Sequence, residues 1–207
     1  MPEPANWAAL ERTSPLLAAM PERVRRSAYT QAVAKAAQVF ARGDRPKAMY
    51  FVVSGEVHLV RSSLTGDQVV LQRARKGFLA EASLDQVSYH CDAIAVRESE
   101  LLTIPRKAFR DALADPEFAR VWMAHLAAEL RRVRAQTERM ALKTADARIL
   151  HYVEAEGRNG SIILHRSKKD WANELGLTHE ALYRALARME RSGLIRVRDR
   201  TLTILSD

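Results

Sequence analysis

The stretch Ser167–Arg191, SKKDWANELGLTHEALYRALARMER, decides the fold of the carboxyl-terminal part of the chain. It predicts two short helices joined by a tight turn. Ser167 suits a helix start because its hydroxyl accepts hydrogen bonds from unpaired backbone N–H groups, and Asp170 adds negative charge at that positive end. Gly176 stands where the first helix should end, because glycine adopts a positive φ at little cost. Thr178 is then a suitable cap for the second helix.

The second predicted helix has two distinct faces. An apolar stripe recurs at the three- and four-residue spacing of a buried surface, and it consists of Leu182, Leu186 and Met189. The opposite face carries polar side chains that we expect to contact DNA: His179, Glu180, Tyr183, Arg184 and Arg188.

A hairpin is predicted after this helix. Ser192-Gly193 ends the helix, Leu194–Val197 has the pattern of a strand, and the turn Arg198-Asp199-Arg200 leads back into Thr201–Leu205. Helix, turn, helix and hairpin together predict a winged helix-turn-helix, whose second helix fits the major groove of DNA. The alternative is an ordinary helical hairpin with a solvated face, but cap, glycine, stripe and basic wing all agree on the winged form. We expect further DNA contacts from the helix starts and the wing: Thr178, Ser167, Lys168, Lys169, Arg198 and Arg200.

This segment resembles the DNA-binding end of the family of the cyclic-AMP receptor protein and the fumarate–nitrate reduction regulator (Crp/Fnr). In that family a glutamate and, four residues later, an arginine read G·C pairs, and Glu180 and Arg184 match those positions. The chemistry is suitable, because arginine can donate two bonds to guanine and glutamate can accept from cytosine. His179 stands where the cyclic-AMP receptor protein has a further base-reading arginine.

The composition indicates a protein with a polyanionic partner and no disulfide framework. The 207 residues are 47% apolar and carry a net charge of +8, which by itself favours only non-specific affinity for nucleic acid, whereas the helix-turn-helix is what predicts double-stranded DNA as the partner. Cys91 is the single cysteine, so one chain can build neither a disulfide nor a cysteine-only metal site. The start lacks a basic, apolar signal core, and no run reaches the roughly eighteen apolar residues of a membrane span. We therefore expect a cytoplasmic protein that has no contact with a membrane.

Short strands punctuated by glycine are predicted in the amino-terminal half. After a helix-rich segment over residues 1–39, turns at Gly43-Asp44, Ser54-Gly55, Gly66-Asp67 and Gly77 separate runs of β-forming residues. The expected strands are Tyr50–Val53, Val57–Arg61, Val69–Leu71, Phe78–Ser83, Ile94–Val96 and Leu101–Ile104. This spacing favours an antiparallel barrel or roll. The order Gly43-Asp44 then Tyr50–Val57 also resembles the β-roll of the same family, which implies an α+β fold with a cyclic-nucleotide-binding-like roll.

A long helix is predicted over Pro116–Leu142. Its apolar residues alternate at three and four positions, as in the seam of a coiled coil: Met123, Leu126, Leu130, Val133, Thr137 and Met140. The alternative is a helix packed on its own roll, which Phe118 and Trp122 favour for the first turns. The family uses this helix to pair two subunits, so the resemblance implies a parallel homodimer. We expect a sensor-like roll at 1–115, a dimerisation helix with its hinge at 116–143, and a DNA-binding domain at 144–207.

The effector pocket of the family is only partly matched. Its ribose-binding glutamate corresponds to Glu81, preceded by Ala80 in place of glycine, but its phosphate-binding arginine is missing. Tyr89-His90 falls at that site, and no arginine or lysine occurs from residue 82 to residue 96. A buried phosphate without a cationic partner loses its charge-assisted bonds. We therefore expect a degenerate pocket of Glu81, Tyr89 and His90 and no control by cyclic AMP.

The sequence leaves several other effectors and functions open. Haem or redox gating would use His58, His90, His125, an amine at Pro2 or the pair His90-Cys91, although a buried, inert thiol is the simpler interpretation of Cys91. We expect no cofactor and no metal, and an iron–sulfur cluster would need four cysteines. A metal-dependent enzyme on the roll would need clustered histidines, which are missing. A nucleoid-type DNA-binding protein without an effector is a further alternative, and RNA polymerase is a partner that the resemblance implies.

Overall fold

Strand β4 (Ala48–Ser54) is central to the amino-terminal half in the computed structural model, which describes residues 3–62, 68–79, 81–165 and 167–205. Successive side chains of a strand point to opposite faces. Met49 and Phe51 therefore join a core shared with helices, whereas Tyr50 and Val52 join a second core between two sheets. All four are buried. One strand thus contributes to both cores of this half.

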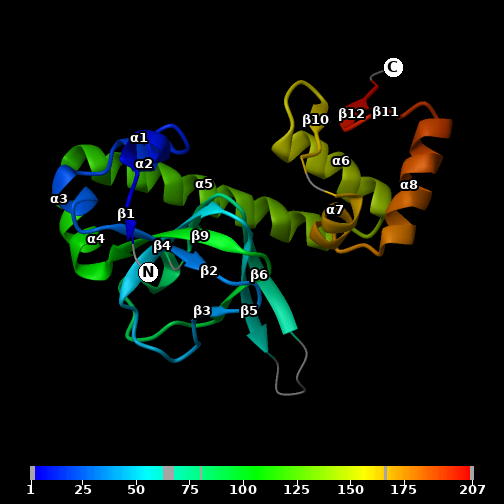
Figure 1. Ribbon diagram of the computed structural model, residues 1–207. Coiled ribbons are helices and arrows are strands. Elements are labelled where there is room, and N and C mark those ends of the chain that lie inside the picture. Colours follow the sequence, from blue (N-terminus) through cyan, green and yellow to red (C-terminus); the bar gives the residue numbers. More distant parts are fainter. Residues whose placement is uncertain (1–2, 63–67, 80, 166, 206–207) are drawn as a thin grey trace. The chain divides into compact units, whose positions relative to one another are not determined.

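Two antiparallel sheets form the roll (Figure 1). The first has the order β1-β2-β9-β4-β7, and its other strands are β1 (Glu3–Pro4), β2 (Tyr29–Val33), β9 (Ser99–Pro105) and β7 (Gly77–Leu79). The second has the order β3-β8-β5-β6, with β3 (Gln38–Phe40), β8 (Asp92–Ala95), β5 (Val57–Ser62) and β6 (Gln68–Ala74). The predicted antiparallel roll is confirmed.

Helices pack on the first sheet. Besides the start of the long helix α5 (Pro116–Ala141), they are α1 (Trp7–Leu10), α2 (Pro15–Ala18), α3 (Glu22–Arg25) and α4 (Arg106–Ala112). The ring of Phe109 meets those of Phe118 and Trp122 edge to face, at centroid distances of 5.6 and 4.9 Å. Such aromatic pairs add to the free energy of apolar burial. The first turns of α5 therefore pack on their own roll, as Phe118 and Trp122 suggested.

Some sequence-based boundaries in this half are wrong. The helix-rich start ends by Arg25, because the alternating run Tyr29–Val33 pairs with β9 instead. Strand β7 stops at Leu79, and Glu81–Ser83 forms one turn of 3₁₀ helix (η1), so the predicted strand Phe78–Ser83 is too long. Strand β8 covers Asp92–Ala95 instead of the predicted Ile94–Val96, because these four residues are the ones that pair with β5. The predicted Gly66-Asp67 turn lies outside the described residues.

The carboxyl-terminal part has the predicted winged helix-turn-helix. It contains α6 (Ala145–Glu156), α7 (Lys168–Glu174) and α8 (His179–Arg191), with a sheet of order β10-β12-β11. The strands are β10 (Ser161–Ile163), β12 (Thr201–Ile204) and β11 (Ile195–Arg198). Sequence analysis predicted the hairpin β11–β12 but missed β10. A single core of buried residues joins these elements, with Trp171, Leu175, Leu182 and Leu186 among them.

The chain divides into two compact units, residues 1–125 and 126–207, so that α5 contributes to both. The segment between α5 and α6 is short, because Thr144 caps α6 through Ala147 N–H and the helix already begins at Ala145. The proposed functional division at residues 115 and 143 stays a prediction. Among the described residues, none of the helices combines the length and apolar character that crossing a lipid bilayer requires.

Gly55 provides a test of the roll. Its φ is +85°, and an added Cβ would lie 2.3 Å from the Glu98 carbonyl oxygen. Gly43 has a similar φ of +92° with nothing within 4 Å of the same position. We expect Gly43→Ala to lower the free energy of unfolding by about 1–2 kcal/mol through the left-handed backbone alone. Gly55→Ala should lower it by at least about 1–3 kcal/mol more, because the clash adds strain. Urea denaturation of both variants checks this, and equal losses would contradict it.

Candidate nucleic-acid interface

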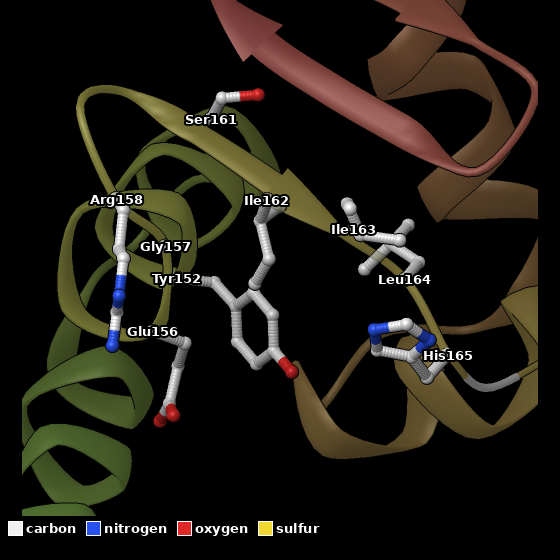
Figure 2. A pocket seen from close by; sticks show the side chains of 9 residues that line it. All are labelled: Tyr152, Glu156, Gly157, Arg158, Ser161, Ile162, Ile163, Leu164 and His165. Carbon is white, nitrogen blue, oxygen red and sulfur yellow. The ribbon is translucent and has the colours of Figure 1, made fainter.

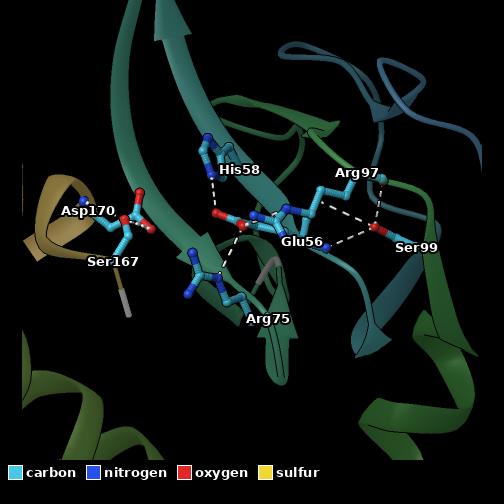
Figure 3. Close-up of polar contacts among 7 residues, drawn as sticks. All are labelled: Glu56, His58, Arg75, Arg97, Ser99, Ser167 and Asp170. Atoms are coloured by element: carbon cyan, nitrogen blue, oxygen red, sulfur yellow. Dashed lines mark hydrogen bonds and ion pairs between the residues drawn. The ribbon is translucent and has the colours of Figure 1, made fainter. Parts of the chain in front are cut away.

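Helix α7 begins as the sequence predicted. The Ser167 hydroxyl accepts a hydrogen bond from the backbone N–H of Asp170 at 3.1 Å and donates to its carboxylate at 2.9 Å (Figure 3). These bonds satisfy one of the unpaired N–H groups at the helix start and hold a negative charge beside it. Inside the helix, Trp171 and Ala172 are buried. The capping prediction for Ser167 is confirmed.

The turn between α7 and α8 is also as predicted. Gly176 has φ +64°, the left-handed value that ends a helix. The next N–H, from Leu177, donates to the Ala172 carbonyl at 2.9 Å. Thr178 then caps α8, with its hydroxyl accepting from Ala181 N–H at 3.1 Å. These bonds and the left-handed glycine therefore hold the two short helices in a defined relation.

Helix α8 has the two predicted faces. Its buried side is Leu182, Ala185, Leu186 and Met189. Its exposed side carries the predicted DNA contacts: His179, Glu180, Tyr183, Arg184 and Arg188. Because the apolar stripe packs one side of α8 into the core, the polar side chains lie together on the opposite side. This is the arrangement with which a helix contacts bases in the major groove.

An aromatic and cationic cluster joins α7 to this exposed face. The Lys168 nitrogen lies over the Tyr183 ring at 4.8 Å from its centroid, and the His179 ring lies 4.6 Å from that of Tyr183. A cation over a ring face is attracted by its quadrupole. The sequence signal was the four-residue spacing of His179 and Tyr183, but the approach of Lys168 depends on how the two helices cross.

Arg188 differs from Arg184 in its surroundings. Its guanidinium forms an ion pair with the Asp146 carboxylate at the start of α6, with Nε 3.2 Å from Oδ2. Sequence analysis missed this pair, which spans forty-two positions of the chain. The positive charge of Arg188 is therefore partly neutralised within the protein. Arg184 has the greater capacity to meet a base.

The wing carries two arginines at its tip. Arg198 pairs with Thr201 in the β11–β12 register, and Asp199 between them takes φ +51°, which tightens the turn. Arg198 and Arg200 are both exposed, as is Lys169 at the start of α7. The wing is held to α8 by the Val197 N–H, which donates to the Glu190 carboxylate at 2.9 Å. Basic groups at the start of α7 and on the wing thus lie on either side of the exposed face of α8.

A cavity of about 590 Å³ opens between the end of α6 and strand β10 (Figure 2). Tyr152, Glu156 and Arg158 line it on the helix side, and Ile162 and His165 on the strand side. None of the predicted DNA-contact residues belongs to its lining. The cavity is therefore separate from the predicted DNA-contact residues.

An apolar stripe is exposed along α5. The predicted seam residues Met123, Leu130 and Val133 have exposed fractions of 67, 51 and 54%, and Leu126 and Met140 have 40 and 39%. Thr137 is exposed as well, with its hydroxyl bonded to the Val133 carbonyl at 3.0 Å. A contiguous apolar surface in water is typical of a protein–protein contact.

Tyr89 fills the interior of the roll at the position where the resemblance expects an arginine. It is 3% exposed, and its ring stacks on that of Phe40 at a centroid distance of 3.8 Å. Its hydroxyl donates to the Ala48 carbonyl at 3.2 Å. Burial raises the pKa of Tyr89 and, with Tyr89 as neighbour, also that of Tyr50, so both phenols stay neutral.

The other two residues of the predicted pocket have different partners. Glu81 faces His125 of α5, with Oε1 and Nε2 3.5 Å apart, and His90 is exposed, with Nδ1 3.3 Å from the Ser83 hydroxyl. The described contacts therefore do not join Glu81, Tyr89 and His90 into one cluster. Ala80 lies outside the described residues. The role of this set as an effector site stays a prediction.

A buried carboxylate that sequence analysis missed lies between β4 and β5, directly before the second sheet (Figure 3). Glu56 is 4% exposed, and it accepts from His58 Nε2 at 2.7 Å and from Arg75 Nε at 3.1 Å, with Arg97 Nε at 3.6 Å. Burial opposes ionisation, but the bonds from His58 and Arg75 outweigh it and lower the pKa of Glu56. The i, i+2 spacing of Glu56 and His58 was the available signal. His58, considered above as a haem ligand, is committed to this pair.

Cys91 is buried, as the simpler interpretation held, with 1% of its surface exposed. Burial and the neighbouring Asp92 raise the pKa of its thiol, so the reactive thiolate is disfavoured. Within the described part of the chain, no group of three or more His, Cys, Asp or Glu side chains is arranged to hold a metal ion.

Comparison with sequence families gives two matches. Residues 30–115 match the cyclic nucleotide-binding domain, and residues 147–206 match the Crp-like helix-turn-helix domain. The first covers most of the roll, and the second covers the helix-turn-helix with its wing.

Individual relatives cover both halves. The nitrogen fixation regulation protein FixK of Azorhizobium caulinodans is 28% identical over 219 residues, which is 100% of this chain and 88% of that protein. The cyclic AMP receptor protein of Thermus thermophilus is 28% identical over 170 residues, covering 80% of this chain and 79% of that one. Among solved structures, DNR from Pseudomonas aeruginosa is 25% identical with a TM-score of 0.54, covering 96% of this chain and 93% of that chain.

Proposed function

The chain belongs to the Crp/Fnr family of DNA-binding transcription regulators, and from that premise we propose that it acts as a homodimer on a palindromic operator without cyclic AMP. The observation that carries the proposal is the exposed face of α8, where Glu180 and Arg184 stand on a capped helix-turn-helix. The protein would work in the cytoplasm, where its DNA lies. RNA polymerase is a further proposed partner.

Base readout falls to Glu180 and Arg184. Both project from the same exposed face because they are four residues apart on one helix. Arginine donates two parallel bonds to guanine O6 and N7, and glutamate accepts from the cytosine amino group. His179, Tyr183 and Lys168 form a cluster at the start of this face, where they would meet the outer part of the half-site.

Phosphate contacts come from the groups that flank α8. Lys169, Arg198 and Arg200 are exposed cations, and the starts of α7 and α8 at Ser167 and Thr178 point N–H groups outward. Such contacts set the register of the protein on the duplex and carry no sequence information. Arg188, also predicted as a DNA contact, would contribute less than these cations because it is paired with Asp146.

Dimerisation through α5 is supported by its exposed apolar stripe. Burying a Leu or Val side chain completely contributes about 1.5–3 kcal/mol, so a seam that includes Leu130 and Val133 favours a second copy of the chain. Two recognition helices related by a two-fold axis read inverted half-sites about 34 Å apart.

Independence from cyclic AMP is supported by the side chain of Tyr89, which is buried inside the roll. Tyr89 offers a buried ring and a hydroxyl already bonded to Ala48, in place of a cation. A ligand shifts an equilibrium only through its different affinities for the two states. Gating by haem, by redox chemistry or by another small ligand is the alternative, as is an effector-independent nucleoid-type protein. Selecting bound sites from random DNA tests the last alternative, because a nucleoid-type protein would enrich no palindrome.

Arg184→Ala tests base readout. We expect a loss of about 1–3 kcal/mol in operator binding together with relaxed preference at one G·C pair. Arg198→Ala is the matched variant on the wing, and it should weaken binding to all sequences about equally, because a phosphate contact is blind to the base. Quantitative binding to a set of single-base operator variants measures both. Full specificity in Arg184→Ala would refute the assignment.

The double variant Leu130→Glu with Val133→Glu tests the seam. We expect monomers and greatly weakened operator binding, because like charges would face each other across the two-fold axis. Ala124→Glu with Ala128→Glu adds the same charge at exposed positions away from the stripe and should leave the dimer intact. Sedimentation at micromolar concentration distinguishes them, and a monomeric wild-type protein would count against the proposal.

Nucleotide titration tests the effector. Calorimetry and operator binding, each with millimolar cyclic AMP or cyclic GMP, should show no saturable binding and no change in DNA affinity. The physical reason is the lack of a charge-assisted partner for the cyclic phosphate. The pocket argument would be wrong if either nucleotide bound and raised operator affinity more than about tenfold, which is roughly 1.4 kcal/mol of coupling.

A further inference from the structure

The joint between α5 and α6 is short and bridged by side chains. Residues 142–144 connect the two helices, at the place where sequence analysis expected a hinge. A flexible joint there would let the helix-turn-helix swing on the end of α5. Residues of the second unit hold the two ends together instead, and all of the contacts described below lie within residues 126–207.

Arg148 of α6 makes the main bridge. Its Nε donates to the Leu142 carbonyl at 2.9 Å, and Nη2 lies 3.5 Å from the Met140 carbonyl, so one edge of the guanidinium meets the end of α5. Its Nη1 donates to the carbonyls of Leu175 and Gly176, at 3.1 and 3.0 Å, where α7 ends. One side chain thus bonds to the ends of two helices.

Both helix ends favour such a group. The last carbonyls of a helix lack partners within it, and the end carries partial negative charge, so a cation there is stabilising. The planar guanidinium presents donors in several fixed directions, which suits carbonyls from two segments. A lysine could supply the charge but not the fork. The arrangement therefore depends on geometry as well as on charge.

Gly176 lets the two segments approach closely. A Cβ at this position would lie 2.9 Å from the Met140 sulfur and 3.1 Å from Arg148 Nη1. Met140, predicted as a seam residue, thus lies against the turn of the helix-turn-helix. The end of the seam and the start of the recognition unit meet at this contact.

Arg139 makes a second connection from α5. It is 1% exposed, its guanidinium lies 4.5 Å from the Tyr152 ring centroid, and Nη2 is 3.5 Å from the Glu156 carboxylate. Tyr152 in turn meets the ring of Trp171 in α7 at 5.6 Å. The last turns of α5, helix α6 and helix α7 therefore form one packed body.

We propose that Arg148 is a positioning residue that sets the orientation of the helix-turn-helix on the carboxyl-terminal half of α5. This inference rests on the homodimer proposed above. Because Leu130, Val133 and Thr137 of the same α5 segment would pair with the second copy, the Arg148 bridge transmits the two-fold axis to α8. The bridge thereby fixes the spacing and relative angle of the two recognition helices, and with them the half-site spacing that the dimer accepts.

Operator spacing gives the first test. Wild-type protein, Arg148→Lys and Arg148→Met are compared on operators with the selected half-site spacing, on operators with one or two base pairs inserted, and on a single half-site. Wild type should prefer the selected spacing, and both variants should lose about tenfold or more of that preference while their half-site affinity is unchanged. A variant that keeps the wild-type preference would overturn the inference. Lys143→Met removes an exposed cation from the same joint and should behave as wild type.

Distances between the two copies give a second test that needs no DNA. A spin label at the exposed position Ala187→Cys, in a Cys91→Ala background, reports the separation of the two α8 helices. We expect a narrow distribution in the otherwise wild-type dimer and a broad one with Arg148→Lys, whose retained charge protects folding if Arg148→Met does not fold. Unchanged distributions would refute the inference alone. A monomeric wild-type protein would refute the homodimer and, with it, the inference.

Discussion

The backbone at Gly176 must take a left-handed φ where the ends of the Met140 and Arg148 side chains pack closely against it, and the carboxyl-terminal unit depends on this constraint. Its φ of +64° ends α7 and aims the chain toward the Thr178 cap of α8. The same residue lies against the ends of the Met140 and Arg148 side chains, which a Cβ would have to displace. Glycine therefore satisfies a local and a long-range condition at once, which joins the direction of the recognition helix to the end of α5.

Two buried polar groups in the roll are stabilised in opposite ways. Glu56 stays charged because His58 and Arg75 bond to it and Arg97 lies beside it, so its burial does not leave an unpaired charge. Tyr89 stays neutral, because burial raises its pKa and its hydroxyl has a carbonyl partner. The phenol of Tyr89 is thus a neutral group inside the roll, and the basic side chains around Glu56 are already paired with its carboxylate.

The apolar stripe on α5 links oligomerisation to DNA recognition. An isolated chain exposes Met123, Leu130 and Val133 to water, which the hydrophobic effect opposes. In the proposed homodimer a second copy covers this stripe, and the recognition helix is duplicated by the same symmetry axis. The contacts of Arg139 and Arg148 then matter for function, since a loose joint would let two correctly folded recognition helices miss their half-sites.

Local patterns in the sequence determined a large part of this protein. The caps at Ser167 and Thr178, the turn at Gly176 and the two faces of α8 depend on neighbouring residues, so spacing and side-chain chemistry were sufficient to predict them. The alternating roll strands and the exposed apolar stripe of α5 followed for the same reason, and the resemblance to a known family added the proposed roles of Glu180 and Arg184.

The tertiary structure alone decided the contacts between residues far apart in the chain. Tyr29–Val33 lies in a segment expected to be helical but forms a strand, because its β-forming residues find cross-strand partners in β9. The Glu56 cluster, the Arg188–Asp146 pair and the stacking of Tyr89 on Phe40 also join distant positions. Arg148 is the clearest case, since no pattern around it indicates that its four carbonyl partners come from the ends of two other helices. Such contacts depend on how helices and strands pack, which residue spacing in one sequence does not encode.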